Sequence, residues 1–193
     1  MGRVSRVVVV CEGFEDSAFA RGFFNEAGLS REIQPRENPR GKSSGHDFVR
    51  KAFVEEVKNL QRFKEGRGVI GFIDEDSTGT EKRITQIDSD LRKLGLPEIS
   101  ASSGRCVLVP VRNLETWVYW LRANQENRQC QANETEDFKQ RPPKGETKLE
   151  KKDFSAAGST FHTLNPASLP KDCLPALGQA RLYLRQFLDA VRR

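Results

Sequence analysis

Histidine and clustered cysteine are scarce in this chain. Its 193 residues include two histidines and four cysteines, and the cysteines, at positions 11, 106, 130 and 173, form no C-x-x-C pair. This pattern argues against a structural zinc site or a disulfide framework and favours a reducing, cytoplasmic compartment. Any metal or acid–base chemistry is therefore expected to depend on carboxylates.

Long apolar runs are missing as well. No stretch approaches the roughly 18 consecutive apolar residues of a membrane span, and the N-terminus leads into only five apolar residues, too few for a secretory signal. We therefore expect no membrane partner. The hydrophobic fraction of 36%, the mean hydropathy of −0.63 and the net charge of +5 are typical of one folded, basic domain.

The chain instead contains three strong strand patterns, each followed by a helical pattern. Residues 4–11, 69–73 and 106–111 are rich in β-branched residues, as in strands covered on both faces. Apolar residues at helical spacing predict helices up to residue 26, over 47–64, from 78 or 80 to 94, and from 114. Ile33 predicts a short edge strand. Alternation of this kind favours an α/β fold with a central, mainly parallel sheet flanked by helices.

The composition changes near residue 124. We expect a core over 1–123, then a polar, basic insertion whose residues 124–160 form a mobile loop, and a C-terminal helical tail over 175–193. That tail carries leucines on one side and Arg181, Arg185 and Arg192 on the other. It either packs on the core or docks a partner.

Acidic residues follow the strong strands. Glu12 ends the first, Asp74 and Asp76 end the second, and Glu115 lies past the third, while Asp16 is one helical turn beyond Glu12. Ligands of open parallel sheets bind beyond the carboxyl ends of the strands. Converging carboxylates repel one another unless a cation neutralises them, and such oxygen ligands suit Mg²⁺ or Mn²⁺. We therefore predict a metal site, with one or two ions, at this edge.

Two segments resemble the motifs of the TOPRIM domain, which is shared by topoisomerases, bacterial primases, ribosomal RNA maturases and OLD-family nucleases. They are Val-Val-Val-Val-Cys-Glu-Gly at 7–13 and Phe-Ile-Asp-Glu-Asp-Ser-Thr-Gly at 72–79. The resemblance implies a Rossmann-like sandwich and Mg²⁺-dependent chemistry on nucleic-acid phosphodiesters. It implies that Asp74 and Asp76 hold Mg²⁺ and that Glu12 binds metal or transfers protons.

Two further features resemble particular groups of TOPRIM proteins. The pair Glu12-x-x-x-Asp16 is similar to the paired acids of OLD-like nucleases, which favours two metals, and Asn-Leu-Glu-Thr-Trp at 113–117 resembles a stretch of small stand-alone TOPRIM proteins. Such proteins are often linked to an ATPase partner in bacterial defence against phage. Glu75 departs from the pattern, since a small residue or proline is common there. The chain also lacks room for topoisomerase gates or a primase zinc module.

The expected function is thus a metal-dependent TOPRIM nuclease acting on DNA or RNA. Two alternatives stay open. One is a non-catalytic binding or regulatory subunit of an ATPase complex, and the other is a small RNA-processing maturase.

Basic residues predict contacts to nucleic acid. Arg36, Arg40 and Lys42 lie in a turn-rich segment, 35–45, that we expect to be a loop beside the site, with His46 at the next helix start. Lys42 is the expected charge stabiliser at the scissile phosphate. The run 139–152 is either a phosphate-binding segment or a disordered charged loop. Trp117 fits the apolar face of its helix, which favours core packing over base stacking.

Overall fold

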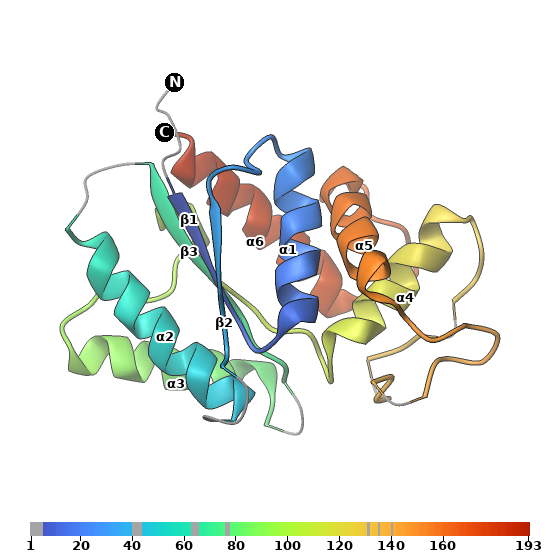
Figure 1. The fold of residues 1–193 in the computed structure, drawn as a ribbon, viewed down its shortest axis with the longest axis horizontal. Coiled ribbons are helices and arrows are strands. Elements are labelled where there is room, and N and C mark those ends of the chain that lie inside the picture. Colours follow the sequence, from blue (N-terminus) through green and yellow to red (C-terminus); the bar gives the residue numbers. More distant parts are fainter. Residues whose placement is uncertain are drawn as a thin grey trace.

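A four-stranded parallel sheet forms the centre of the molecule. The computed structural model describes residues 6–39, 44–62, 66–75, 78–130, 132–134, 136–139 and 141–193. The strands are β1 (Arg6–Cys11), β2 (Ile33–Glu37), β3 (Arg67–Phe72) and β4 (Arg105–Leu108), in the spatial order β2-β1-β3-β4. The fold class is therefore the α/β class that the sequence predicts (Figure 1).

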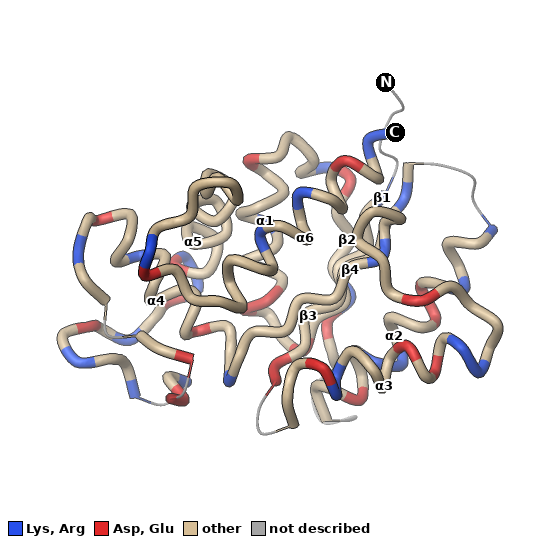
Figure 2. Tube along the Cα trace, turned by 180° about the vertical axis from the view of Figure 1, so that it is seen from behind, with Lys and Arg blue, Asp and Glu red and all other residues tan. Residues whose placement is uncertain are grey.

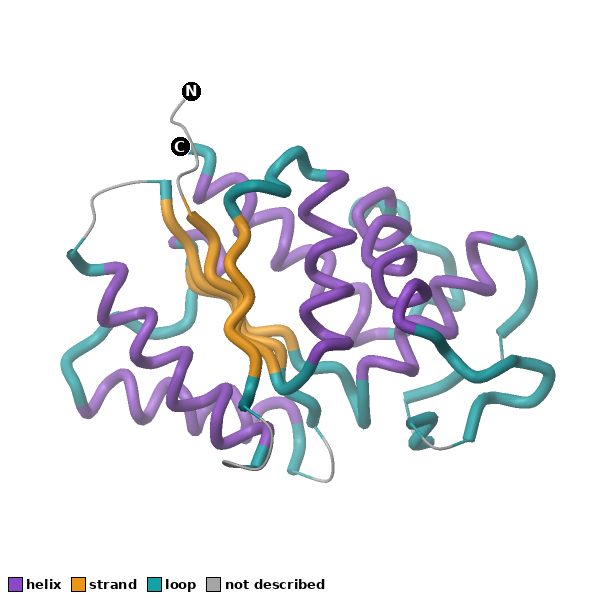
Figure 3. Tube along the Cα trace, in the orientation of Figure 1, coloured by secondary structure: helices purple, strands orange, loops and turns teal. Residues whose placement is uncertain are grey.

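Helices cover both faces of this sheet (Figure 3). Helices α2 (Gly45–Leu60) and α3 (Thr80–Lys93) lie on one side, and α1 (Phe14–Glu26) and α6 (Pro175–Val191) lie on the other (Figure 1). Beyond α1, on the same side, lie α4 (Leu114–Gln125) and α5 (Lys151–Thr163), and a 3₁₀ turn, Ala101–Ser103, precedes β4.

The β-branched run of β1 shows why a parallel sheet forms here. Val7 and Val9 are buried in the core beneath α1 and α6, whereas Val8 and Val10 are buried in the core beneath α2. Because successive strand residues point to opposite faces, a strand covered on both faces has to be apolar throughout. The same alternation continues along β3, where Ile70 belongs to the first core and Val69 to the second.

The edge strand β2 extends further than the sequence predicts. It runs to Glu37 and pairs with β1 in parallel register, Val9 opposite Pro35 and Val10 opposite Arg36. The prediction that the loop begins at residue 35 was therefore wrong. Proline lacks a backbone donor and is tolerated on an edge strand, so Pro35 does not end β2.

Helix α5 overturns the expectation that residues 124–160 form a loop throughout. Its buried residues are Phe154, Ala157, Gly158 and Phe161. Two of these four are small, so the helical pattern has few large apolar side chains. The helix nevertheless packs on α1, where Phe161 lies 5.4 Å from the ring of Phe19.

Glycines allow α1 and α5 to approach closely. A Cβ atom at Gly158 would lie 2.0 Å from the carbonyl oxygen of Phe19, and one at Gly22 would lie 1.9 Å from that of Ser155. Both contacts are to backbone, which cannot turn aside as a side chain can. The interhelical distance therefore depends on glycine at these two positions.

We expect Gly158→Ala to lower the free energy of unfolding by about 3 kcal/mol, because overpacking forces the two helices apart. Alanine otherwise favours a helix by about 1 kcal/mol over glycine. Gly178→Ala in α6 is the matched control, since its nearest contact is the flexible side chain of Leu169 at 3.0 Å. Urea unfolding measures both variants. Equal stability of the two variants would contradict the proposed role of Gly158.

Candidate functional site

The first acidic pair lies where β1 passes into α1. Asp16, in the first turn of α1, is buried, and its Oδ2 accepts hydrogen bonds from the backbone N–H groups of Glu12 at 3.0 Å and Gly13 at 3.1 Å. A carboxylate at a helix N-terminus satisfies free backbone donors and complements the helix dipole. Asp16 therefore fixes the turn that presents Glu12.

Glu12 joins the two sequence motifs. Its Oε1 accepts a hydrogen bond from the backbone N–H of Asp74 at 3.1 Å, so the carboxyl ends of β1 and β3 meet through this side chain. On its other side, Glu12 lies against the first residue of α2, because a Cβ atom at Gly45 would fall 2.0 Å from Oε2. Glu12 thus lies between the end of β3 and the N-terminus of α2.

The third acidic position is at the start of α4. Asn113 caps this helix, with its Oδ1 accepting from the backbone N–H of Thr116 at 3.3 Å and from its hydroxyl at 3.2 Å. The cap holds the next residue but one, Glu115, in the first turn of α4. Within the 113–117 stretch, Asn113 and Thr116 therefore have a structural role that positions Glu115.

A lysine outside the predicted site lies among these acids. The ammonium of Lys139 is 2.6 Å from Oδ2 of Asp74. Asp137 positions Lys139 relative to α4. Its Oδ1 accepts hydrogen bonds from the side chain of Asn113 at 2.7 Å and from the backbone N–H of Lys139 at 2.9 Å. The neighbouring Phe138 is buried, with its ring 6.1 Å from that of Tyr119.

The sequence grouped Lys139 with a charged run and missed this role. One signal was available, a single phenylalanine in a polar segment. A lone aromatic residue of this kind marks a place where a loop can be anchored to the core.

The electrostatics show that the acids act on one another. Burial and then the charge of Asp74 raise the pKa of Asp16 well above its ordinary value, although hydrogen bonding to Gly13 opposes this, and Glu12 and Glu115 add to the increase. Burial also raises the pKa of Glu115 to about 7, with Asp74 contributing and Lys139 opposing. Burial lowers the pKa of Lys139, but Asp74, Glu115 and Glu12 outweigh it and the pKa rises.

The structure places four of the five predicted metal-binding residues, Glu12, Asp16, Asp74 and Glu115, within electrostatic reach of one another. The fifth, Asp76, lies outside the described residues. Carboxylate oxygens are the ligands that Mg²⁺ and Mn²⁺ prefer, and the mutual repulsion of the acids indicates a place where a cation would be stabilised. Among the described residues, however, no group of three or more acidic, histidine or cysteine side chains forms a ready ligand set. The donor types fit Mg²⁺, but the described acids alone do not form the ligand set.

The structure describes two of the four residues that the sequence predicts to contact nucleic acid, Arg36 and His46. Arg36 is in β2 rather than in a loop, and its guanidinium pairs with Glu55 at 2.5 Å and Glu56 at 2.7 Å, both on α2. His46 is partly exposed near the start of α2, with Nε2 4.0 Å from Asp47. Arg40 and Lys42 lie outside the described residues.

The two tryptophans of α4 are buried. Trp117 is fully enclosed, which confirms the prediction of core packing, and Trp120 donates its ring N–H to the carbonyl of Asp172 at 3.0 Å. Neither ring is open to a base in this conformation.

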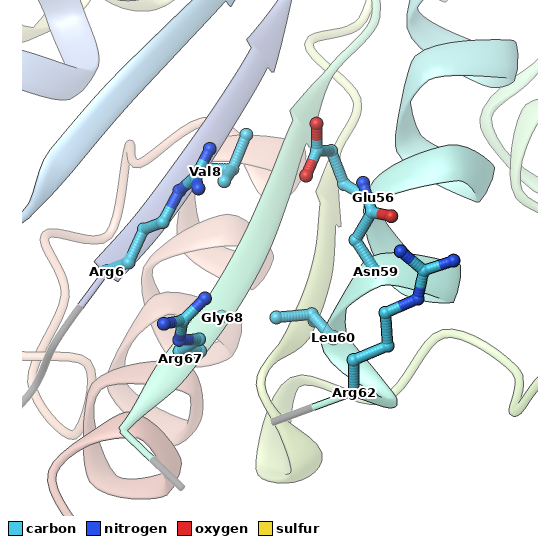
Figure 4. A pocket seen from close by; sticks show the side chains of 8 residues that line it. All are labelled: Arg6, Val8, Glu56, Asn59, Leu60, Arg62, Arg67 and Gly68. Atoms are coloured by element: carbon cyan, nitrogen blue, oxygen red, sulfur yellow. The ribbon is translucent and has the colours of Figure 1, made fainter. Parts of the chain in front are cut away.

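A pocket of about 230 Å³ lies at the opposite ends of the strands (Figure 4). It is formed by Arg6 and Arg67, the first residues of β1 and β3, and by the C-terminal part of α2 around Asn59. The acidic residues lie at the other ends of these strands, so this pocket is separate from the candidate site.

Comparison of the chain with protein-family models, curated proteins and solved structures finds no match. Membership of the TOPRIM family therefore stays a prediction from the two motifs. Within the described residues, no helix combines the length and apolar character needed to cross a membrane.

The raised pKa of Glu115 gives a pH dependence to stability. Its ordinary value is 4.5 and its value here is about 7, so the folded chain retains a proton that the unfolded chain loses between these pH values. The stability that this carboxyl contributes is complete below about pH 4.5 and is lost as the pH rises through 7.

We expect Glu115→Gln to raise the free energy of unfolding by about 2 kcal/mol at pH 8 and by nothing at pH 4.5. Denaturant unfolding at several pH values measures this. Glu26→Gln, at the exposed far end of α1, is the control and should leave the pH profile unchanged. A constant effect of Glu115→Gln at all pH values would contradict the prediction.

The pair Lys139–Asp74 is tested by a double-mutant cycle. We expect Lys139→Met to lower the free energy of unfolding by about 2 kcal/mol at pH 8, because Asp74 loses its ammonium partner while other carboxylates remain nearby. Adding Asp74→Asn should restore part of that loss, since the repulsion falls with the charge. Strictly additive losses in urea unfolding would show that the two side chains are not coupled.

Proposed function

We propose that this chain is a Mg²⁺-dependent nuclease of the TOPRIM type that hydrolyses phosphodiester bonds. The observation that carries the proposal is the hydrogen bond from the backbone of Asp74 to the Glu12 carboxylate, which joins the two motifs at one point. Asp16 and Glu115 lie within electrostatic reach of the same point. Acidic groups at the carboxyl edge of a parallel sheet are where such a fold binds its ligand.

The metal would be held by Asp74 and Glu12, with Asp76, Asp16 and Glu115 as the remaining ligands, and Mn²⁺ would serve in its place. Bound Mg²⁺ supplies Lewis-acid stabilisation of charge on the phosphoryl group. Whether one or two ions bind depends on how many of these carboxylates ligate together.

The chain's own groups supply positioning and charge. Asp16 fixes the turn that carries Glu12, and the N–H of Asp74 holds the Glu12 carboxylate at the end of β3, where it would bind metal or transfer protons. Lys139 places a cation beside Asp74. There it would neutralise charge on an incoming phosphate, the task that the sequence assigned to Lys42.

The substrate and partners follow from the same proposal. The substrate is DNA or RNA, contacted by Arg36, Arg40, Lys42 and His46 when the Arg36 ion pairs open. An ATPase partner in a bacterial defence system against phage belongs to the proposal through the TOPRIM resemblance, and a cytoplasmic location belongs to it through the scattered cysteines.

A second candidate function has one specific observation in its favour. The Lys139 ammonium already neutralises Asp74, and Asp16 already caps the backbone of α1, so two of the acids have structural partners without a metal. A non-catalytic TOPRIM-like subunit of an ATPase complex would have this arrangement. The RNA-maturase alternative differs from the nuclease only in substrate.

Cleavage assays test the nuclease proposal. We expect the wild-type chain to cleave DNA or RNA with Mg²⁺ or Mn²⁺, and we expect Asp74→Asn and Glu12→Gln each to reduce the rate at least about 100-fold, since each removes a metal ligand or proton carrier. Glu26→Gln, which removes one acid from the far end of α1, should keep full activity. Cleavage that persists in EDTA would reject the metal mechanism.

Calorimetry with Mn²⁺ separates the two candidates. Binding to the wild-type chain that disappears in Asp74→Asn supports the metal site even when no substrate is cleaved. No binding, together with copurification of an ATPase, supports the non-catalytic subunit.

A further inference from the structure

A second polar pocket lies far from the acidic site. Its volume is about 370 Å³, and it lies between the C-terminal end of α5 and the middle and end of α6. It is near the C-terminus of α1, because Arg192 of its lining donates to the carbonyl of Ala27 at 2.6 Å. Asp16 is in the first turn of α1, and a helix of 13 residues is about 20 Å long, so the two sites lie at opposite ends of this helix.

The pocket is lined by positive charge. Arg181 and Arg185 are in α6 and Arg192 is the residue that caps its C-terminus. They are four and seven residues apart, so all three lie along one side of the helix. Figure 2 shows basic positions along α6 and at its end. Among the described residues that line the pocket, Asp189 is the one acid, which leaves a formal excess of two positive charges with His162 neutral.

Arg181 is the least accessible of the three arginines. It is 8% exposed, its Nη2 donates to the carbonyl of His162 at 2.7 Å, and its guanidinium lies 5.7 Å from the ring centre of Phe23. Its Nε and Nη1 atoms are buried and have no hydrogen-bond partner among the residues that the structure describes. A buried guanidinium without a carboxylate is costly, because it loses hydration without gaining a counter-charge.

Helix capping explains only part of this arrangement. Arg181 and Arg192 each donate one hydrogen bond to a carbonyl at the end of a helix, α5 and α1 respectively, where a cation complements the helix dipole. Capping leaves the two unpartnered nitrogens of Arg181 unexplained. It also does not explain why Arg185 adds a third charge beside them, where burial and then Arg185 lower the pKa of Arg181.

Polar groups beside the arginines complete the lining. Thr163, the last residue of α5, and Asn165, just beyond it, line the pocket. The Oδ1 of Asn165 accepts from the backbone N–H of Ala167 at 3.0 Å, so its amide nitrogen remains a donor. The volume falls in the range of about 300–1,000 Å³ that is typical of small-molecule sites.

We propose that this pocket is a binding site for a phosphate group. Arginine is the side chain best suited to phosphate, because its planar, permanently charged fork donates several hydrogen bonds at once. The phosphate belongs either to a free phosphomonoester or to the backbone of a nucleic acid. The site is independent of the proposed nuclease centre and contains none of its acidic residues.

Titration of the full-length protein with inorganic phosphate, without Mg²⁺, tests the proposal. Nuclear magnetic resonance of the arginine Nε–H groups reports on the site directly. We expect the signals of Arg181 and Arg185 to shift with saturation at millimolar phosphate or below. Arg185→Gln, at an exposed position, should weaken binding about tenfold, the effect of losing one charged hydrogen bond.

Arg92→Gln is the control, because it removes another exposed arginine, from α3 on the other side of the sheet. It should leave phosphate binding unchanged. Equal weakening by both variants would mean nonspecific attraction and would overturn the proposal, as would the absence of any shift at Arg181 and Arg185. Binding of an acidic peptide without phosphate binding would overturn it in favour of a protein-docking surface.

A single-stranded oligonucleotide without terminal phosphates distinguishes the two sources. If Arg185→Gln weakens its binding as it weakens that of phosphate, the ligand is nucleic-acid backbone. If oligonucleotide binding is unchanged while phosphate binding is weakened, the ligand is a free phosphomonoester. The weakening of phosphate binding by Arg185→Gln should be the same whether or not the chain cleaves nucleic acid, so failure of the nuclease proposal and failure of this one are distinguishable.

Discussion

Repulsion between carboxylates at the carboxyl edge of the sheet is the constraint on which the candidate site depends. Parallel strands end side by side, and the chain places acids after β1 and β3 and at the start of α4. Three interactions stabilise them there. Asp16 and Glu12 each accept hydrogen bonds from backbone N–H groups, and the ammonium of Lys139 pairs with Asp74. Burial is the largest cause of the raised pKa values of Asp16 and Glu115, and the charge of Asp74 raises both further. A divalent cation would offset the repulsion, which is the physical basis of the proposed metal site.

The same constraint ties the second half of the chain to the first. Lys139 comes from the segment after α4, and Phe138 anchors that segment in the core that also contains Val7 and Val9 of β1. Helix α6 packs on one face of the sheet. Phe187 and Val191 of this helix lie so close to β3 that a Cβ atom at Gly68 would collide with them. The residues after 123, where the composition changes, thus share a core with the strands and place Lys139 beside Asp74.

The sequence predicted those features that depend on local pattern. Runs of valine and isoleucine identified the strands because both faces of the sheet are covered, and acids directly after the strands identified the edge where they converge. Helix α5 was missed because its contact with α1 is made by Gly158 and Gly22, whose importance is visible only when the two backbones are side by side. Lys139 was missed for a similar reason, since its role depends on Asn113 and Asp137 meeting from segments 24 residues apart. Arg36 was assigned to a loop because Pro35 suggested one, and its pairing with Glu55 and Glu56 is a tertiary contact with no local signature.

Gly45 has a consequence for how the candidate site can be studied. Its missing Cβ is what leaves room for the Glu12 carboxylate at the start of α2. A methyl group at this position would displace the carboxylate while leaving its charge in the chain. A substitution of Glu12 itself removes the carboxylate, so it cannot distinguish the effect of the charge from the effect of its position. Position 45 allows the location of the Glu12 carboxylate to be varied independently of its presence.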